Sequence, residues 1–173
     1  MALARRQPRL APRIAARLRL LVLDVDGVLT DGRLYYGARG ELMKAFHVRD
    51  GHGIKLLQAA GVEVAVISGR RSPAVLRRCR ELGIRFVTQG AADKSAALDA
   101  LRKRAGLQFD SEIACVGDDT PDIPLFARVA WSFAVADAHP LARAAAHAVT
   151  TLPGGRGAVR EVCDALIEAR SRA

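Results

Sequence analysis

The stretch "LLVLDVDGVLTDG", residues 20–32, decides how the rest of the chain is interpreted. Its first four residues are apolar, and a continuous apolar run is typical of a strand buried on both faces of a parallel sheet. Two carboxylates, Asp24 and Asp26, follow at the end of that strand. Like charges placed so close repel each other, so a bound cation or a chemical role must stabilise the pair. Gly27 then fits a tight turn that needs unusual backbone angles.

Beyond this stretch the chain alternates short apolar strands with amphipathic helices, the pattern of a doubly wound parallel α/β sheet. Residues 33–48 interrupt the alternation and predict a small β-hairpin around a turn at 37–40. The other predicted strands are 62–68, 84–87, 112–119 and 131–137. The predicted helices are 14–20, 51–61, 72–83 with Ser72 as N-cap, about 93–105, a short one after 119, one near Pro140, and 158–170.

The composition indicates one packed domain. The chain has 173 residues, half of them apolar, which is enough for a core without disulfides or structural metals. Its three cysteines are widely spaced, and we interpret them as buried thiols of a reducing cytoplasm. No apolar run is long enough to span a membrane, and no signal peptide is recognisable, so we expect a cytoplasmic protein without a membrane partner.

The net charge of +9 is concentrated at the N-terminus. Residues 1–20 hold six arginines and no acid, which leaves 21 basic against 18 acidic residues in the remainder. We interpret residues 1–18 as a basic tail dispensable for chemistry and 19–173 as a single domain. An RNA-binding segment and an arginine-rich transit peptide are the alternatives for the tail. The rest of the chain lacks interleaved basic and aromatic residues, so nucleic acid is not favoured as a partner.

Polar residues gather where the predicted strands end. Ser68 ends one strand, Asp118 and Asp119 end another, and Lys94 begins the helix after the strand between them. Ligands of doubly wound sheets bind at the carboxyl ends of the strands. Three acids around one point suit a hard divalent cation, with Mg²⁺ the best match, and a lysine with a hydroxyl can hold phosphoryl oxygens. One carboxylate of the first pair can then attack phosphorus while the other exchanges protons.

The motifs "DVDGVLT" (24–30), "SGR" (68–70), an isolated lysine and "GDDTPD" (117–122) resemble those of the haloacid dehalogenase superfamily of phosphatases. Longer blocks, among them "FHVRDGHGIKLL" (46–57), "AVADAHP" (134–140) and "GGRGAVREVCD" (154–164), resemble a narrower family. That family is the 3-deoxy-D-manno-octulosonate 8-phosphate phosphatases, a capless branch of the superfamily. The resemblance extends from about residue 19 to 169.

This resemblance implies roles for individual residues. Asp24 would be the nucleophile and Asp26 the general acid and base. Mg²⁺ would be held by the Asp24 side chain, the Asp26 carbonyl and the Asp118 side chain, with Ser68 and Lys94 on the phosphoryl group. The implied substrate contacts are Asp26, His47, Val48, Arg49, Asp50, Gly51, Lys55, Arg70, Arg78 and Lys94. Asp119 and Asp122 match the acidic end of the last motif, and we interpret them as residues that orient the ligands.

Motif spacing leaves no room for a cap domain: 30–50 holds only the hairpin, and 68–94 only one helix and one strand. A capless site needs cover from water, for which a neighbouring subunit is the natural candidate. Tyr35, Tyr36 and Phe46 would either contact that subunit or pack in the core. The resemblance implies a homotetramer whose C-terminal tail covers a neighbouring site. The glycine-rich segment "LPGGRGAVRE" (152–161) is either a plain loop with a helix start or a close approach of its glycines to a ligand, with Arg156 or Arg160 aimed at an anion.

The residues also bear on the substrate. An acidic sugar phosphate carries a carboxylate far from its phosphate, and Arg70 and Arg78 lie eight residues apart, which predicts that both point into one mouth. The alternative for Arg78 is a solvated run of charges. A sialic-acid-type 9-phosphate is the alternative substrate.

Two other classes of protein are disfavoured. A phosphate-receiving signalling domain takes phosphate on an Asp at a later strand end, and neither 62–68 nor 84–87 ends in Asp. A nucleotide-binding module is disfavoured because no glycine-rich phosphate loop is present.

Overall fold

The computed structural model describes residues 10–173, and its core is a sheet of six parallel strands in the order β5-β4-β1-β6-β7-β8. These strands are β1 (Leu20–Leu23), β4 (Glu63–Ser68), β5 (Phe86–Gln89), β6 (Ile113–Gly117), β7 (Trp131–Ala134) and β8 (Ala148–Val149). All residues of β1 and β6 are buried, as expected for central strands. The predicted fold class is confirmed.

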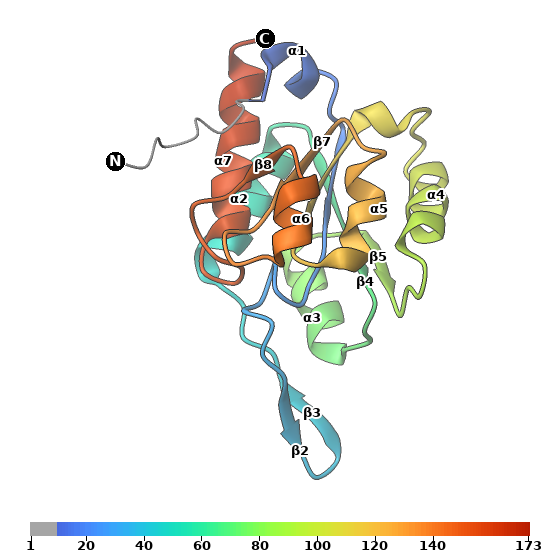
Figure 1. The fold of residues 1–173 in the computed structure, drawn as a ribbon, viewed down its shortest axis with the longest axis vertical. Helices are drawn as coiled ribbons and strands as arrows, with labels where there is room; N and C mark the ends of the chain where they lie inside the picture. The colour runs from blue at the N-terminus through green and yellow to red at the C-terminus, as the bar shows by residue number, and fades with distance from the viewer. Residues whose placement is uncertain (1–9) are drawn as a thin grey trace.

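Helices cover both faces of the sheet (Figure 1). On one face α2 (Val48–Ala59) packs against α7 (Ala158–Ser171), with α3 (Pro73–Leu82) beside α2. On the other face lie α4 (Lys94–Arg104), α5 (Ile123–Phe126) and α6 (Pro140–Ala145). Two short 3₁₀ helices, η1 (Asp110–Glu112) and η2 (Thr120–Asp122), flank β6.

The predicted hairpin consists of β2 (Tyr35–Gly37) and β3 (Gly40–Met43), which pair antiparallel and extend from one end of the molecule (Figure 1). Between β1 and α2 the chain forms no larger insertion, and between β4 and α4 it forms only α3 and β5. The described residues therefore contain no cap domain, as predicted. The C-terminus lies at the opposite end of the molecule from the hairpin.

The strand order reverses beside β1. From β1 the chain moves outward through β4 and β5, then returns to place β6 on the other side of β1. Such a switch point leaves a crevice at the carboxyl ends of the two central strands. Those ends lie at the same end of the molecule as the hairpin (Figure 1).

Several element boundaries differ from the predictions. Strand β5 begins at Phe86, two residues after the predicted start at residue 84. The buried Ile84 lies in the loop before it, and β5 itself is a half-buried edge strand, so its apolar residues do not mark its bounds. Helix α2 begins at Val48 rather than at residue 51, and the two-residue β8 was not predicted. At Ser72 the side chain makes no capping bond, because its hydroxyl donates to Glu41 instead.

Part of the predicted basic arm packs on the domain. Its helix, α1 (Pro12–Ala15), is short and lies earlier than predicted. Ala15 and Leu18 are buried, and Arg170 of α7 donates hydrogen bonds to both of their carbonyl oxygens, at 2.9 and 2.8 Å. The division at residue 18 stays a prediction, but these contacts favour counting 10–18 with the domain. Residues 1–9 lie outside the described part.

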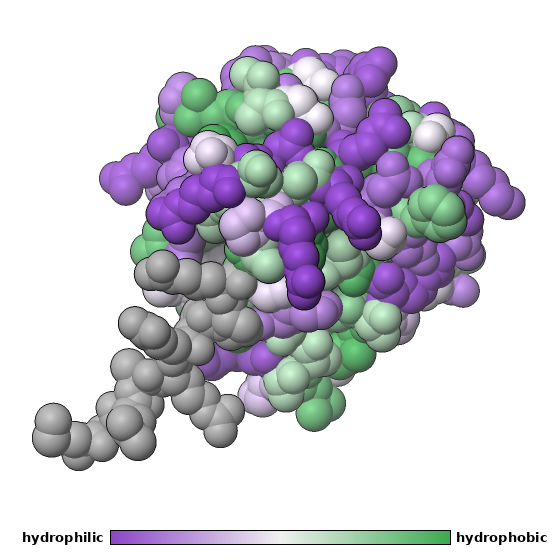
Figure 2. Space-filling model, turned by 90° about the horizontal axis from the view of Figure 1, so that it is seen from above, coloured by the Kyte–Doolittle hydropathy of each residue, from purple (hydrophilic) through white to green (hydrophobic). Residues whose placement is uncertain are grey.

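Seen from the end that carries α1, the surface is largely hydrophilic, with hydrophobic residues in separate patches (Figure 2). Among the described helices, none has the length and apolar character needed to cross a bilayer.

Candidate active site

Two central strands bring the first two acidic residues together. Leu23 of β1 is level with Val116 of β6, and the Asp24 amide donates to the Val116 carbonyl at 3.1 Å. Asp24 and Asp118 therefore leave the sheet side by side. Gly27 has a positive φ of 89°, and a Cβ there would lie 2.1 Å from Asp118 Oδ2. Glycine is thus required both by the turn and by the close carboxylate.

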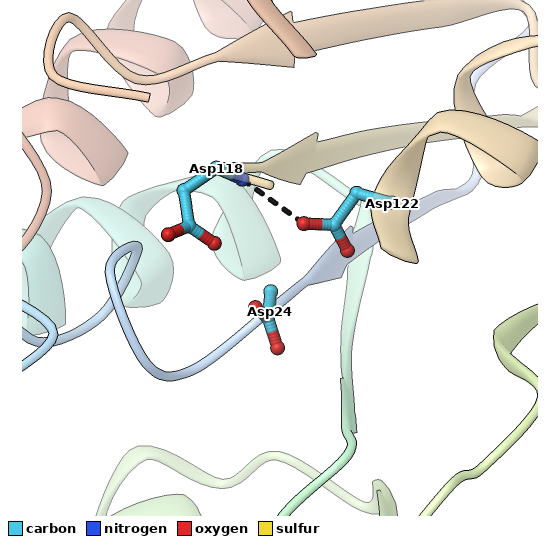
Figure 3. A group of neighbouring side chains, drawn as sticks. All are labelled: Asp24, Asp118 and Asp122. Carbon is cyan, nitrogen blue, oxygen red and sulfur yellow. Dashed lines mark hydrogen bonds between the residues drawn. The ribbon is translucent and has the colours of Figure 1, made fainter. Parts of the chain in front are cut away.

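Asp122 completes a cluster with these two residues (Figure 3). One carboxylate oxygen from each of the three lies within 4.8 Å of the others. Asp122 Oδ2 accepts hydrogen bonds from the amides of Asp118, at 3.0 Å, and Asp119, at 3.3 Å. Its Oδ1 accepts from Lys94 Nζ at 2.6 Å. Both oxygens of Asp122 therefore have protein partners, which supports the predicted orienting role, while Asp119 caps η2.

Lys94 is the first residue of α4, whose N-cap Asp93 accepts from the amides of Ser95 and Ala96. The Lys94 ammonium lies 3.0 Å from Asp24 Oδ1 and contacts Asp122, and only 7% of the Lys94 side chain is exposed. Burial alone would lower the pKa of Lys94, but the two carboxylates outweigh it and raise that pKa. Lys94 is therefore a charged partner held against Asp24.

The cluster carries excess negative charge. Burial, followed by the Asp122 charge, raises the pKa of Asp24 to about 6 despite Lys94. Burial and the neighbouring carboxylates raise the pKa of Asp118 to about 8. Oxygen ligands with excess negative charge fit a hard divalent cation such as Mg²⁺, which would remove this repulsion. The Asp24 and Asp118 carboxylates lie close together in this cluster, and we expect them to hold such an ion.

These pKa values give the stability a definite pH dependence in EDTA. A carboxyl whose folded pKa is raised above its usual 3.8 binds protons more tightly in the folded state. Its contribution is fully present below about pH 4 and is lost as the pH rises through about 6 for Asp24 and 8 for Asp118. We expect the melting temperature in EDTA to fall from pH 5 to pH 8. Mg²⁺ should raise it more at pH 8 than at pH 5.

Scanning calorimetry of wild type and Asp118→Asn checks this result. The variant lacks the carboxyl with the most raised pKa, so its melting temperature should fall less over the same range. A wild-type melting temperature that rises toward pH 8 in EDTA, or identical slopes in both proteins, would contradict the assignment.

A cavity of about 540 Å³ opens beside the cluster. Eight of the residues singled out in the sequence line this cavity: Asp24, Asp26, Ser68, Arg70, Lys94, Asp118, Asp119 and Asp122. Ser68 is buried at the end of β4, and its hydroxyl accepts from the Arg70 amide at 3.3 Å. The structure thus brings together the predicted nucleophile, acid, phosphoryl-binding and metal-binding positions.

The remaining predicted substrate contacts do not line this cavity. His47, Val48, Arg49, Asp50, Gly51 and Lys55 lie in the first two turns of α2 or at its cap. The Asp50 carboxylate is buried and accepts from the amides of Gly157 and Arg160, so it holds the start of α7. The Arg78 side chain packs against Gly51. A Cβ added at Gly51 would lie 2.2 Å from Arg78 Nη2. Arg70 lines the cavity and Arg78 does not, so the expectation that both face one substrate stays a prediction that depends on an assembly of several chains.

The glycine-rich segment contacts its own chain. The amide of Gly155 donates to Val28 at 2.9 Å, and that of Gly154 donates to Asp137 at 2.9 Å. A Cβ at Gly154 would lie 1.6 Å from the Gly27 carbonyl oxygen. The two backbones touch, so these glycines are explained by packing against the loop after β1. The Arg160 side chain pairs with Asp164, at 2.8 Å, and does not line the cavity.

Sequence reasoning missed a second group of residues near Asp26. Lys44, just after β3, forms an ion pair with Asp26, and Tyr36 of β2 accepts from Arg70 Nη2 at 2.7 Å. Asp26 and Lys44 are 18 residues apart and share no helical or strand period. No local signal could have paired them.

The fold and the cluster define a haloacid dehalogenase-like hydrolase, and a family model of that description matches residues 81–159. The 3-deoxy-D-manno-octulosonate 8-phosphate phosphatase of Yersinia pestis is 50% identical over 159 residues, 91% of this chain and 84% of its own. The enzyme of that name from Escherichia coli K12 is 48% identical over 158 residues, with the same coverage. The chain belongs to the 3-deoxy-D-manno-octulosonate 8-phosphate phosphatase family.

Solved structures agree with this assignment. The Yersinia pestis phosphatase superposes with a TM-score of 0.89 at 47% identity, over 94% of this chain and 87% of that one. The phosphatase of Moraxella catarrhalis, solved with magnesium, phosphate and KDO, superposes with a TM-score of 0.88 at 39% identity, over 93% of this chain and 92% of that one.

Proposed function

We propose that this protein is a Mg²⁺-dependent phosphatase that hydrolyses 3-deoxy-D-manno-octulosonate 8-phosphate to the free sugar acid and phosphate. The observation that carries the proposal is the buried Asp24, paired with Lys94 at 3.0 Å and clustered with Asp118 and Asp122, in a chain of this family. The reaction supplies a precursor of lipopolysaccharide. The three cysteines, all free and buried, agree with a reducing compartment such as the cytoplasm.

The first half-reaction forms an aspartyl-phosphate. An Asp24 oxygen attacks phosphorus, and the bond from phosphorus to the sugar oxygen breaks, with its electron pair going to that oxygen. Asp26, which lines the same cavity, gives a proton to the departing oxygen. Lys94 and Ser68 hold the phosphoryl oxygens.

In the second half-reaction Asp26 takes a proton from water while the water oxygen attacks phosphorus. The bond between phosphorus and Asp24 breaks, and its electron pair restores the carboxylate. The Asp24 and Asp118 side chains, with the Asp26 carbonyl, would hold Mg²⁺, and the bound ion would supply positive charge against the phosphoryl oxygens. Asp122 keeps Lys94 and Asp118 in place.

A panel of phosphate esters tests the substrate. We expect kcat/KM for 3-deoxy-D-manno-octulosonate 8-phosphate to exceed that for neutral sugar phosphates of similar size by at least about 100-fold, the scale of a few specific polar contacts. The panel includes a sialic-acid-type 9-phosphate. A higher kcat/KM for that ester would replace the proposed substrate with the alternative one. Full activity in excess EDTA would contradict the Mg²⁺ dependence.

We also propose that the protein acts as a homotetramer assembled through its hairpin. The hairpin and the start of α2 expose large apolar side chains, namely Leu34, Tyr36, Leu42, Met43 and Val48, of which Leu42 is 71% and Val48 80% exposed. Several exposed large apolar side chains within one short segment, residues 34–48, favour a protein contact. Phe46, by contrast, packs against the core of its own chain. In the assembly the start of α2 would cover a neighbour's site, whereas the end of α7 packs on the α1 segment of its own chain through Arg170.

The assembly gives Arg78 a role in the neighbouring site. We expect Arg78→Ala to raise KM for the acidic sugar phosphate about 10-fold to 100-fold, the loss for one charge-assisted hydrogen bond, and to leave KM for p-nitrophenyl phosphate nearly unchanged. Mixing unfolded Arg78→Ala and Asp24→Asn chains and refolding them together should recover activity, because mixed assemblies contain sites with both residues intact. Equal losses on both substrates, or no recovery on mixing, would contradict this role.

A further inference from the structure

Lys44 stands out because nothing in the reaction described so far uses it. It follows β3 in the hairpin, and its side chain is only 2% exposed. A buried ammonium is costly unless carboxylates surround it. Its nitrogen contacts Asp26 Oδ1 and lies 3.2 Å from Glu41 Oε2. Lys44 therefore joins the hairpin to the residue proposed as general acid and base.

The other members of this group hold Lys44 in place. Glu41 accepts a hydrogen bond from the Ser72 hydroxyl at the start of α3, which fixes the hairpin on the body of the protein. Burial alone would raise the pKa of Glu41, but the Ser72 hydroxyl and Lys44 together lower it, so Glu41 stays an anion. Arg70, itself bound to Tyr36, lies 3.9 Å from Asp26 Oδ2.

The two oxygens of Asp26 differ as a result. Lys44 occupies Oδ1, whereas Oδ2 accepts no hydrogen bond from the residues that the structure describes. Asp26 lines the cavity beside Asp24. A carboxylate with one oxygen anchored can present the other in a single orientation, which proton transfer to a leaving oxygen requires.

We propose that Lys44 is a positioning residue for Asp26, through which the hairpin orients the acid and base of the reaction. This inference rests on the proposed function. It assigns to the hairpin a second task besides contact between subunits, because Lys44 comes from the hairpin and Arg70 is bound to its Tyr36.

The test uses Lys44→Met, which removes the ammonium and keeps the stem, with Lys103→Met on exposed α4 surface as control. For 3-deoxy-D-manno-octulosonate 8-phosphate we expect kcat of Lys44→Met to fall about 10-fold to 100-fold, with KM within about threefold, because protonation of the sugar oxygen is lost. For p-nitrophenyl phosphate, whose leaving group needs no proton, the first turnover should stay fast and hydrolysis of the aspartyl-phosphate should be slow. Stopped-flow absorbance should then show a burst of nitrophenolate larger than that of wild type. Lys103→Met should behave as wild type.

Three results would overturn the proposal: kcat of Lys44→Met within about twofold of wild type, a change in KM alone, or first turnovers slowed equally for both substrates. If Lys44→Met does not fold, Glu41→Gln keeps the ammonium but weakens its anchor. Its kcat for the sugar phosphate should then fall several-fold at unchanged KM, and an unchanged kcat would overturn the proposal. Asp26→Asn, measured in parallel, distinguishes a failure of the role proposed for Lys44 from a failure of the proposed mechanism. Full turnover by Asp26→Asn would refute the proposed acid and base itself.

Discussion

Asp24→Asn is expected to remove turnover of every phosphate ester, by at least about 10⁴-fold, since loss of a covalent nucleophile has effects of this size. The amide has nearly the same shape as the carboxylate, so the fold should persist. It cannot attack phosphorus and carries no charge to balance Lys94, 3.0 Å away in the wild-type protein. The measurements are steady-state kcat and acid-quench trapping of phosphorylated protein.

Asp164→Asn on α7 is the matched control, because Asp164 is 53% exposed and pairs only with Arg160 among the described residues. It should retain full turnover and form the same phosphorylated species as wild type. Near-normal turnover by Asp24→Asn, or an acid-stable phosphoryl label on that variant, would contradict an aspartyl-phosphate at residue 24.

Gly154→Ala is expected to have the largest effect on stability, with a loss of about 3 kcal/mol in the free energy of unfolding. The added Cβ would lie 1.6 Å from the Gly27 carbonyl oxygen, so one of the two backbone segments must move. Gly27 directly follows Asp26, and movement of its loop should also lower kcat. Urea unfolding at one fixed chain concentration measures the stability change, since assembly adds to it.

Gly37→Ala in the hairpin is the control for this change. A Cβ there would meet only Leu42 Cδ1, at 3.5 Å, an ordinary contact, and the backbone has no positive φ. We expect its stability to stay within about 1 kcal/mol of wild type. If Gly154→Ala lowered the free energy of unfolding as little as Gly37→Ala, the backbone around Gly154 would be able to shift without disturbing the loop after β1. The packing explanation of these glycines would then fail.

Much of the active site could be predicted because its geometry follows from strand order. Asp24, Ser68 and Asp118 each come at or just after the end of a parallel strand, and parallel strands in one sheet place their carboxyl ends at one edge. Lys94 follows from the same rule, at the start of the next helix. Apolar runs mark buried strands reliably, whereas the half-buried edge strand β5 was misplaced by two residues.

Residues assigned through the family resemblance fared differently. The structure places Asp50 under α7 and Arg78 against Gly51, away from the cavity lined by Asp24. A motif shows that these residue types occur together, but it does not show whether a side chain serves its own chain's site or another's. Their substrate contacts therefore stay a prediction that depends on the assembly.

By itself, the sequence determined the parallel sheet apart from β8, the absence of an inserted cap and the meeting of Asp24 with Asp118, because each depends on local periodicity, on spacing or on a rule of parallel sheets. The tertiary structure alone decided that Lys44 pairs with Asp26 and that Gly154 lies on Gly27. Those contacts join segments 18 and 127 residues apart, whose approach depends on how the hairpin and the loop before α7 pack on the domain. No repeating pattern along the chain encodes such an approach, since it is set by the shapes of surfaces that exist only after folding.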